Sequence, residues 1–319
     1  MDRAGCTGCR RLPGKLKPAV KARFPELPFD LFRCADCGLV QQFPRASVAK
    51  VSSRYDRDYY VFHEDDTRRF ARAVQQYLIH LRPLESGGPK RLLDLGCARG
   101  HFSALAKHRG WRVTGIDLSG EAVSHAVATF GIDARAGMLA RHASTLPPFD
   151  VVFLGDVIEH VPDPRDLLKD VYRVLAPRGS VCIDTPNWGG FWRRIGRSRW
   201  LGINPFHINL FDATALTHLL ERCGFRRIET HAYTHYQYAS LNSRPEFARL
   251  LSWLPRFMRS RIRSILTAAA GAGDWADLRD HSPATLEQAS DFIHRAARDL
   301  PALRMSRWGD NLMATALRA

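Results

Sequence analysis

The chain has 319 residues, of which 45% are hydrophobic and 25% charged, and these globular proportions exclude a wholly disordered protein. It has no run of about 18 apolar residues, which excludes a transmembrane helix, and no N-terminal pattern typical of a secretory signal. The net charge of +15 suggests a nucleic-acid or anionic-membrane partner. However, only seven of the 47 basic residues are lysines, a skew that genomic codon bias also produces.

Four of the seven cysteines form two Cys-x-x-Cys pairs, Cys6 with Cys9 and Cys34 with Cys37. Two such pairs can present four thiolates to one zinc ion, and four protein ligands leave no open position for a substrate. We therefore predict a structural zinc ribbon over residues 1–50. Redox or incidental thiols and a four-thiolate iron–sulfur cluster are the alternatives. An odd cysteine count without a secretory signal favours a cytoplasmic location.

Residues 51–89 are expected to form a lid loop and a linking helix. The loop at 52–62 is aromatic and contains Tyr55, Tyr59 and Tyr60, which are candidates to cover a pocket or to lie in solvent. The helix begins at His63, and its apolar residues recur at helical spacing until a Ser-Gly-Gly-Pro breaker at 86–89.

Strand and helix patterns alternate after this breaker. Strands are expected at 91–96, 111–117, 132–137, 149–154, 180–185 and 225–230, and helices at 101–109, 119–130, 164–176 and 213–223. Such alternation predicts an α/β fold with a doubly wound, Rossmann-like, mostly parallel sheet, whose ligand lies at the carboxyl ends of the strands. A seventh strand near 310–317 completes a core formed by residues 90–239 and 306–319.

Residues 240–305 interrupt this alternation and are expected to form a basic helical insertion. Apolar residues at helical spacing run from Phe247 to Ile265, with arginines between them. A basic amphipathic stretch is typical of a lid packed on its domain, and also of an element that contacts an anionic membrane surface. Arginines near the acceptor site would also suit a phosphate-bearing substrate.

The first strand of the core runs into the loop Asp94-Leu95-Gly96-Cys97-Ala98-Arg99-Gly100. Its small residues allow a sharp turn and close approach of the backbone to a ligand. The three-glycine dinucleotide fingerprint fails because position 98 is alanine. Asp117 ends the second strand, where a carboxylate can accept hydrogen bonds from a ribose diol. Loop and acid together favour a nucleoside-containing cofactor without a diphosphate.

Three segments in this order, LLDLGCARGHFSALA, WRVTGIDLS and PFDVVFLGDVIEHVPDPRDLLKDVYRVLAPRGSVCIDTPN, resemble the class I S-adenosylmethionine-dependent methyltransferases. The resemblance covers about residues 90–230 and is strongest to the branch that includes ubiquinone-biosynthesis O-methyltransferases. The leading cysteine pairs, with CGLVQQFP and YDRDYY after them, are similar to zinc-headed methyltransferases of polysaccharide and deoxysugar pathways.

This resemblance implies S-adenosylmethionine as the cofactor and a set of residues that contact it. Asp94, Gly96, Cys97 and Gly100 would surround its methionine and ribose, and Asp117 would bind the ribose hydroxyls. Leu118 would pack on the adenine, and Leu154 and Gly155 would line the methyl-donor side. No acid occurs at 134–140 to bind the adenine amino group, so backbone groups near Gly137 and Met138 would have to replace it.

Two histidines are candidates for the base that removes a proton from a hydroxyl acceptor. His160 follows the fourth strand, with Glu159 or Asp156 available to orient it, and His207 lies in the loop after the fifth strand. Purely structural roles are the alternative for both histidines.

We therefore expect a cytoplasmic methyltransferase that acts on a small molecule, a sugar or a glycan, most simply by O-methylation. The acceptor would be a small molecule or a nucleotide- or lipid-linked sugar. Sugar C-methylation and RNA methylation are the alternative activities, and nucleic acid is the less favoured partner because GDVIEH does not resemble the motif of many base methylators. A non-enzymatic zinc-ribbon adaptor is the third alternative.

Overall fold

The computed structural model describes residues 5–10, 16–22, 29–44, 72–86, 90–233, 255–257, 259–260, 283–296 and 309–319. The aromatic loop at 52–62, with its three tyrosines, and the start of the helix predicted from His63 lie outside these residues. So does most of the apolar and basic stripe between Phe247 and Ile265.

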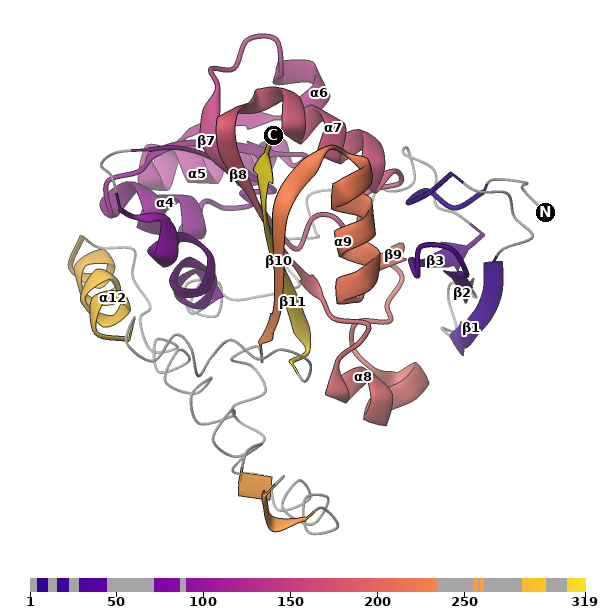
Figure 1. Ribbon diagram of the computed structural model, residues 1–319. Coiled ribbons are helices and arrows are strands. Elements are labelled where there is room, and N and C mark those ends of the chain that lie inside the picture. The colour runs from indigo at the N-terminus through magenta and orange to yellow at the C-terminus, as the bar shows by residue number, and fades with distance from the viewer. Residues whose placement is uncertain are drawn as a thin grey trace.

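A seven-stranded sheet forms the centre of the protein (Figure 1). Its order is β10-β11-β8-β7-β4-β5-β6, and every pair is parallel except those that β11 makes with β8 and β10. The strands are β4 (Arg91–Leu95), β5 (Arg112–Asp117), β6 (Asp133–Ala136), β7 (Phe149–Gly155), β8 (Leu175–Pro186), β10 (Phe225–Tyr233) and β11 (Asn311–Arg318). This confirms the predicted fold, and the order reverses between β4 and β7, which places a ligand site at the carboxyl ends of these strands.

The two faces of the sheet enter two separate cores, because successive strand residues point to opposite sides. Leu93 and Val152 pack in one core with α7 (Pro164–Val174) and α9 (Ala213–Arg222). Their neighbours Leu92 and Val151 pack in the other core. The second core is covered by η3 (Tyr77–Leu81), α4 (His101–His108) and α12 (Pro283–Ala296). In Figure 1, α12 accordingly lies beside α4, and α9 lies toward the opposite flank.

Polar side chains cap the N-termini of two helices that follow strands of the sheet. The Ser119 hydroxyl accepts from Ala122 N and begins α5 (Gly120–Phe130), and the Asp163 carboxylate accepts from Arg165 N and Asp166 N at the start of α7. Such caps satisfy backbone donors that the first helical turn leaves unpaired. The remaining short helices are η4 (Arg82–Leu84), α6 (Leu139–His142), α8 (Phe191–Gly196) and η5 (Arg197–Arg199).

The boundary between α7 and β8 differs from the expectation of a helix to 176 and a strand from 180. The helix ends at Val174 and β8 starts at once with Leu175, which pairs with Phe149. The turn-like Pro177-Arg178-Gly179 lies inside the strand, where Arg178 has a φ of 62° and the register with β7 shifts.

A second, four-stranded antiparallel sheet forms at the N-terminus, in the order β1-β2-β3-β9. Its strands are β1 (Leu16–Ala22), β2 (Phe29–Cys34), β3 (Val40–Phe43) and β9 (Asn209–Leu210). The last of these belongs to the loop after β8, and it pairs Asn209 with Gln41 and Leu210 with Val40. The N-terminal sheet is therefore completed by a strand from the α/β core, a feature that the predicted division at residue 50 does not contain.

The predicted insertion falls between β10, which ends at Tyr233, and β11, which begins at Asn311. Within it, α12 buries Ala289 and Ile293 against the core that includes α4. Arg256, at the start of a short helical stretch, is exposed. Among the described residues, no helix has the length and apolar character needed to cross a bilayer.

Candidate active site and metal site

The four N-terminal cysteines come together into one buried cluster. Cys6 Sγ lies 3.4 Å from Cys37 Sγ, Cys9 Sγ lies 3.6 Å from Cys34 Sγ, and all four sulfurs lie within 4.8 Å of one another. A tetrahedral zinc ion with bonds of about 2.3 Å separates its sulfurs by about 3.8 Å. The four thiols therefore fit one zinc ion, as predicted, and they leave no position for substrate.

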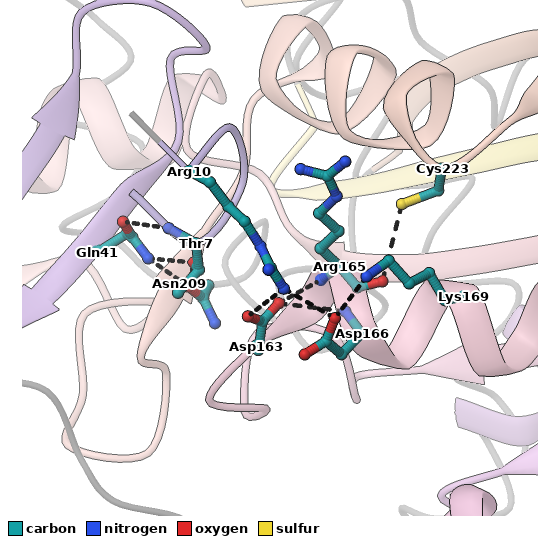
Figure 2. A network of polar contacts seen from close by, with 9 residues as sticks. All are labelled: Thr7, Arg10, Gln41, Asp163, Arg165, Asp166, Lys169, Asn209 and Cys223. Carbon is teal, nitrogen blue, oxygen red and sulfur yellow. Dashed lines mark hydrogen bonds and ion pairs between the residues drawn. The ribbon is translucent and has the colours of Figure 1, made fainter. Parts of the chain in front are cut away.

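The described N-terminal residues 5–10, 16–22 and 29–44, here called the cysteine module, are joined to the core by a buried polar network (Figure 2). Gln41 Nε2 donates to Thr7 Oγ1 and, over 3.2 Å, to Asn209 Oδ1. Asn209 Nδ2 in turn donates to the Val161 carbonyl at 2.7 Å. Arg10 adds exposed contacts to α7, with Nη2 3.0 Å from Asp166 Oδ1, and such exposed pairs contribute little energy.

A cavity of about 880 Å³ lies at the carboxyl ends of β4, β5 and β7. This volume lies within the usual range for small-molecule sites. The loop after β4 passes under it, and Gly96 there has a φ of +80°, where a β-carbon would collide with the Val157 side chain. Glycine is thus required at this position for the loop to turn so close to the segment after β7.

The Asp117 carboxylate is fixed at the edge of this cavity. Its Oδ2 accepts from Ala98 N at 2.9 Å and its Oδ1 accepts from Ser119 N at 2.8 Å. A carboxylate oxygen can accept two hydrogen bonds, so this group is chemically suited to accept from a diol. The apolar side chains of Leu118 and Met138 stand beside it, 40% and 42% exposed, as a surface on which a nucleobase can pack.

Asp94 lies deeper in the same cavity and is 3% exposed. Burial raises the pKa of this carboxyl to about 7, although Ser103 Oγ donates to it at 2.6 Å. A cation placed beside a buried carboxylate favours its ionised form. The position thus suits a positively charged part of a ligand.

The cavity is lined by six of the eight predicted cofactor residues, namely Asp94, Gly96, Cys97, Asp117, Leu118 and Gly155. The other two lie elsewhere. Leu154 is fully buried in the core with α7 and α9, because only alternate residues of β7 face each side. Gly100 lies at the start of α4, where a β-carbon would approach Ala126 Cβ to 2.7 Å, so it serves the packing of α4 on α5.

Both candidate histidines line the same cavity. Their rings make an edge-to-face contact, with the ring centroids 4.8 Å apart. His160 Nδ1 lies 3.0 Å from the Phe206 carbonyl oxygen, and His207 Nδ1 lies 2.9 Å from that of Gly202. A carbonyl oxygen only accepts, so each Nδ1 carries the hydrogen and each Nε2 keeps a lone pair in the neutral ring. Burial lowers the pKa of His207 to about 4.

Glu159 lies beneath the two histidines and is fully buried. Its Oε2 accepts from Thr185 Oγ1 at 2.9 Å, whereas its Oε1 has no hydrogen-bond partner among the described residues and lies 3.7 Å from His160 Nε2. Burial raises the pKa of this carboxyl to about 8. One ligand atom each from Glu159, His160 and His207 lie within 4.8 Å of one another, so the group can also hold a metal ion.

The orientation of His160 does not come from Asp156, which the sequence offered as one of two partners. Asp156 has a φ of +53° and instead pairs with Arg72, while Gln76 Nε2 donates to it at 3.2 Å. Arg72 and Gln76 lie in the helical residues 72–76 and line the cavity. No sequence signal pointed to them, because their acidic partner lies some 80 positions away.

His101 is a third cavity residue that the motif did not identify. It is the first residue of α4, is 5% exposed and lines the cavity. Its position directly after Gly100 is the signal that could have placed it there, since the start of the helix after β4 faces the ligand site.

A family model described as a methyltransferase domain matches residues 62–230, more than half of the chain. The chain therefore belongs to this methyltransferase-domain family, and S-adenosylmethionine is the cofactor of that family, as the sequence predicted. The residues at the cavity fit this cofactor. Gly96 provides a close backbone turn, Asp117 a fixed carboxylate, and Leu118 with Met138 an apolar surface.

Two curated relatives match about a third to a half of this chain. A probable S-adenosylmethionine-dependent methyltransferase from Mycolicibacterium smegmatis is 34% identical over 145 residues, or 45% of this chain and 55% of the relative. A ubiquinone biosynthesis O-methyltransferase from Aeromonas salmonicida is 38% identical over 112 residues, or 32% of this chain and 47% of the relative. The chain spans about half the length of the curated relatives it matches.

Solved structures of methyltransferases are also similar to this chain. One is the S-adenosylmethionine-dependent methyltransferase from Archaeoglobus fulgidus, with a TM-score of 0.48 and 20% identity over 78% of this chain and 94% of the other.

Proposed function

We propose that this protein transfers the methyl group of S-adenosylmethionine to an oxygen atom of a sugar or another small metabolite. The observation that carries the proposal is the pair His160 and His207, which line the same cavity as the cofactor loop with both Nδ1 atoms hydrogen-bonded to backbone carbonyls. A hydroxyl acceptor needs a base, and a neutral imidazole with a fixed tautomer provides one. Relatives named as ubiquinone biosynthesis O-methyltransferases support transfer to oxygen.

His160 is the residue we assign as the base. Its Nε2 would take the hydroxyl proton as the acceptor oxygen forms its bond to the methyl carbon and the carbon–sulfur bond breaks. Glu159 Oε1, 3.7 Å away, would then stabilise the resulting imidazolium as a carboxylate, because the new positive charge lowers the raised pKa of this carboxyl. The low pKa of His207 keeps its ring neutral, so its Nε2 would accept a hydrogen bond from the acceptor.

Bound S-adenosylmethionine supplies an electrophilic methyl group on a sulfonium. The protein's own contribution is alignment of the acceptor oxygen with that methyl group, which in well-oriented reactions is worth roughly 7–11 kcal/mol. We assign a nucleotide- or lipid-linked sugar as the acceptor class, because the chain is strongly basic at +15 and such acceptors carry phosphate.

The experiment is methyl transfer from radiolabelled S-adenosylmethionine into a cell extract that is then separated into RNA, protein, lipid and small-molecule fractions. We expect label in the small-molecule or lipid-linked sugar fraction, and none with the Asp117→Ala variant. With the acceptor in hand, His160→Ala should lower kcat by about 10²- to 10⁴-fold without changing cofactor affinity. Label confined to RNA would overturn the proposal.

A further inference from the structure

A second cleft, of about 650 Å³, lies between the cysteine module and α8. It shares no lining residue with the cofactor cavity. Trp188 lines this cleft and Trp200 lines the cofactor cavity. Their rings meet edge to face, with the ring centroids 6.3 Å apart. The two tryptophans therefore form part of the wall between the two spaces.

Basic side chains predominate in the cleft. Lys17 from β1, Arg33 from β2 and Arg193 from α8 line it, together with a single acid, Asp36. Each cation comes from a different element, so the cluster is assembled by the fold and is not a run of charge on one helix.

Arg193 lacks an acidic partner among the described residues. Its guanidinium carbon lies 3.9 Å from the centre of the Trp188 ring, and its Nε is buried without a hydrogen-bond partner. Burial lowers the pKa of this guanidinium, and the nearby charges of Arg194 and Arg33 lower it further. A buried donor without an acceptor is costly, and a ligand that supplies an anionic oxygen removes that cost.

Arg33 is held in place by groups that leave part of its guanidinium available. Its Nη2 donates to Asp212 Oδ2 at 2.7 Å, and its Nε donates to the Gly38 carbonyl at 3.2 Å. No described contact uses its Nη1. A guanidinium fixed in this way loses little freedom when it binds an anion.

We propose that this cleft binds a phosphate-bearing ligand, contacted by the Arg193 and Arg33 guanidinium groups with Trp188 as its floor. Phosphate is the anion that planar, multiply donating guanidinium groups recognise best. The inference goes beyond the proposed function and does not depend on it, because the cleft lies outside the cofactor cavity. The phosphate can belong to the methyl acceptor or to a separate small anion, and the two sources are separable by experiment.

A competing explanation is that the arginines balance the charge of the zinc site. Cys34 and Cys37 also line the cleft, and zinc with four thiolates carries a formal charge of −2. That explanation requires the basic side chains for zinc retention, whereas a ligand site requires them only for ligand binding. Zinc content therefore distinguishes the two explanations.

The test measures binding of inorganic pyrophosphate to the zinc-loaded full chain by titration calorimetry. Arg193→Met keeps an apolar side chain over Trp188 and removes the charge. Arg222→Ala is the matched control, because Arg222 ends α9, is exposed and does not line the cleft. We expect Arg193→Met to weaken binding by about 10- to 100-fold, with Arg222→Ala within about twofold of wild type. Zinc content and cofactor affinity should be unchanged in both.

The proposal is overturned if the wild type does not bind pyrophosphate, if Arg193→Met binds it equally well, or if Arg193→Met loses zinc. Uridine diphosphate glucose, titrated in parallel, distinguishes the sources. Tighter binding of the sugar nucleotide than of pyrophosphate, lost in Arg193→Met, supports a phosphate carried by the acceptor. Equal binding of the two probes, also lost in that variant, supports a separate small anion.

Discussion

Replacing Gly96 with alanine tests whether the cofactor loop needs the close backbone approach at this residue. Alanine in a left-handed conformation costs about 1–2 kcal/mol. The new β-carbon would also collide with the Val157 side chain, and inserting a carbon into a packed site costs about 1–3 kcal/mol. If the loop relaxes to remove both costs, it loses the geometry that binds the cofactor, and affinity should fall by at least about 30-fold.

Two further glycines separate these two costs. Gly110 has a φ of +92°, but a β-carbon added there would meet nothing within 4 Å, so Gly110→Ala should show only the conformational cost. Gly120 begins α5 in an ordinary conformation with open space around it, so Gly120→Ala should be nearly neutral. Thermal unfolding and calorimetric titration with S-adenosylhomocysteine measure both effects. The reasoning is refuted if Gly96→Ala binds S-adenosylhomocysteine as tightly as Gly110→Ala does.

The two sites support three further predictions, for variants at Asn209, Cys34 and His207. Asn209→Leu removes the donor of the part-buried Val161 carbonyl, so unfolding experiments should show a loss of about 0.5–1.5 kcal/mol, and kcat should fall more than cofactor affinity; equal losses in both would contradict this. Cys34→Ala should abolish stoichiometric zinc by elemental analysis and lower the Tm, and full zinc retention would argue against the four-cysteine site. Because the pKa of His207 falls from 6.5 to about 4 on folding, the unfolded chain binds more protons between these values, and stability should decrease as pH falls through that window. Because acids such as Asp184 also have lowered pKa values, both proteins should lose stability in acid, and urea unfolding should show a smaller loss between pH 6.5 and 4 in His207→Gln than in the wild type.

The central sheet was predictable because strands such as β4, β7 and β8 are mostly buried apolar runs, separated by amphipathic helices and glycine stops. The two-residue strand β9, by contrast, could not be predicted from the sequence. Asn209 and Leu210 form β9 because β3 lies beside them, and a two-residue segment carries no periodicity of its own. Likewise, the turn signal at 177–179 was overridden by pairing of Leu175 with Phe149.

The site was predictable where its residues follow a strand. Asp94, Asp117 and His160 all come at or just after the carboxyl end of a strand, and all three line the cavity. The sequence did not show which of Leu154 and Gly155 lines the cavity, because this depends on the face of β7 to which each residue points. The groups that fix the histidines are backbone carbonyls, of Phe206 and Gly202, which leave no mark in the residue types.

Pairing of β3 with β9 connects the cysteine module to the segment that carries His160. The backbone N–H groups of Ile208 and Asn209 both donate to the Glu159 carbonyl, directly before His160. The segment that pairs with the N-terminal sheet thus also holds the segment that carries His160, the proposed base. The cysteine module therefore cannot be removed without an effect on the core. Without it, β9 would lose its pairing partner β3, and the segment that positions His160 would become less ordered.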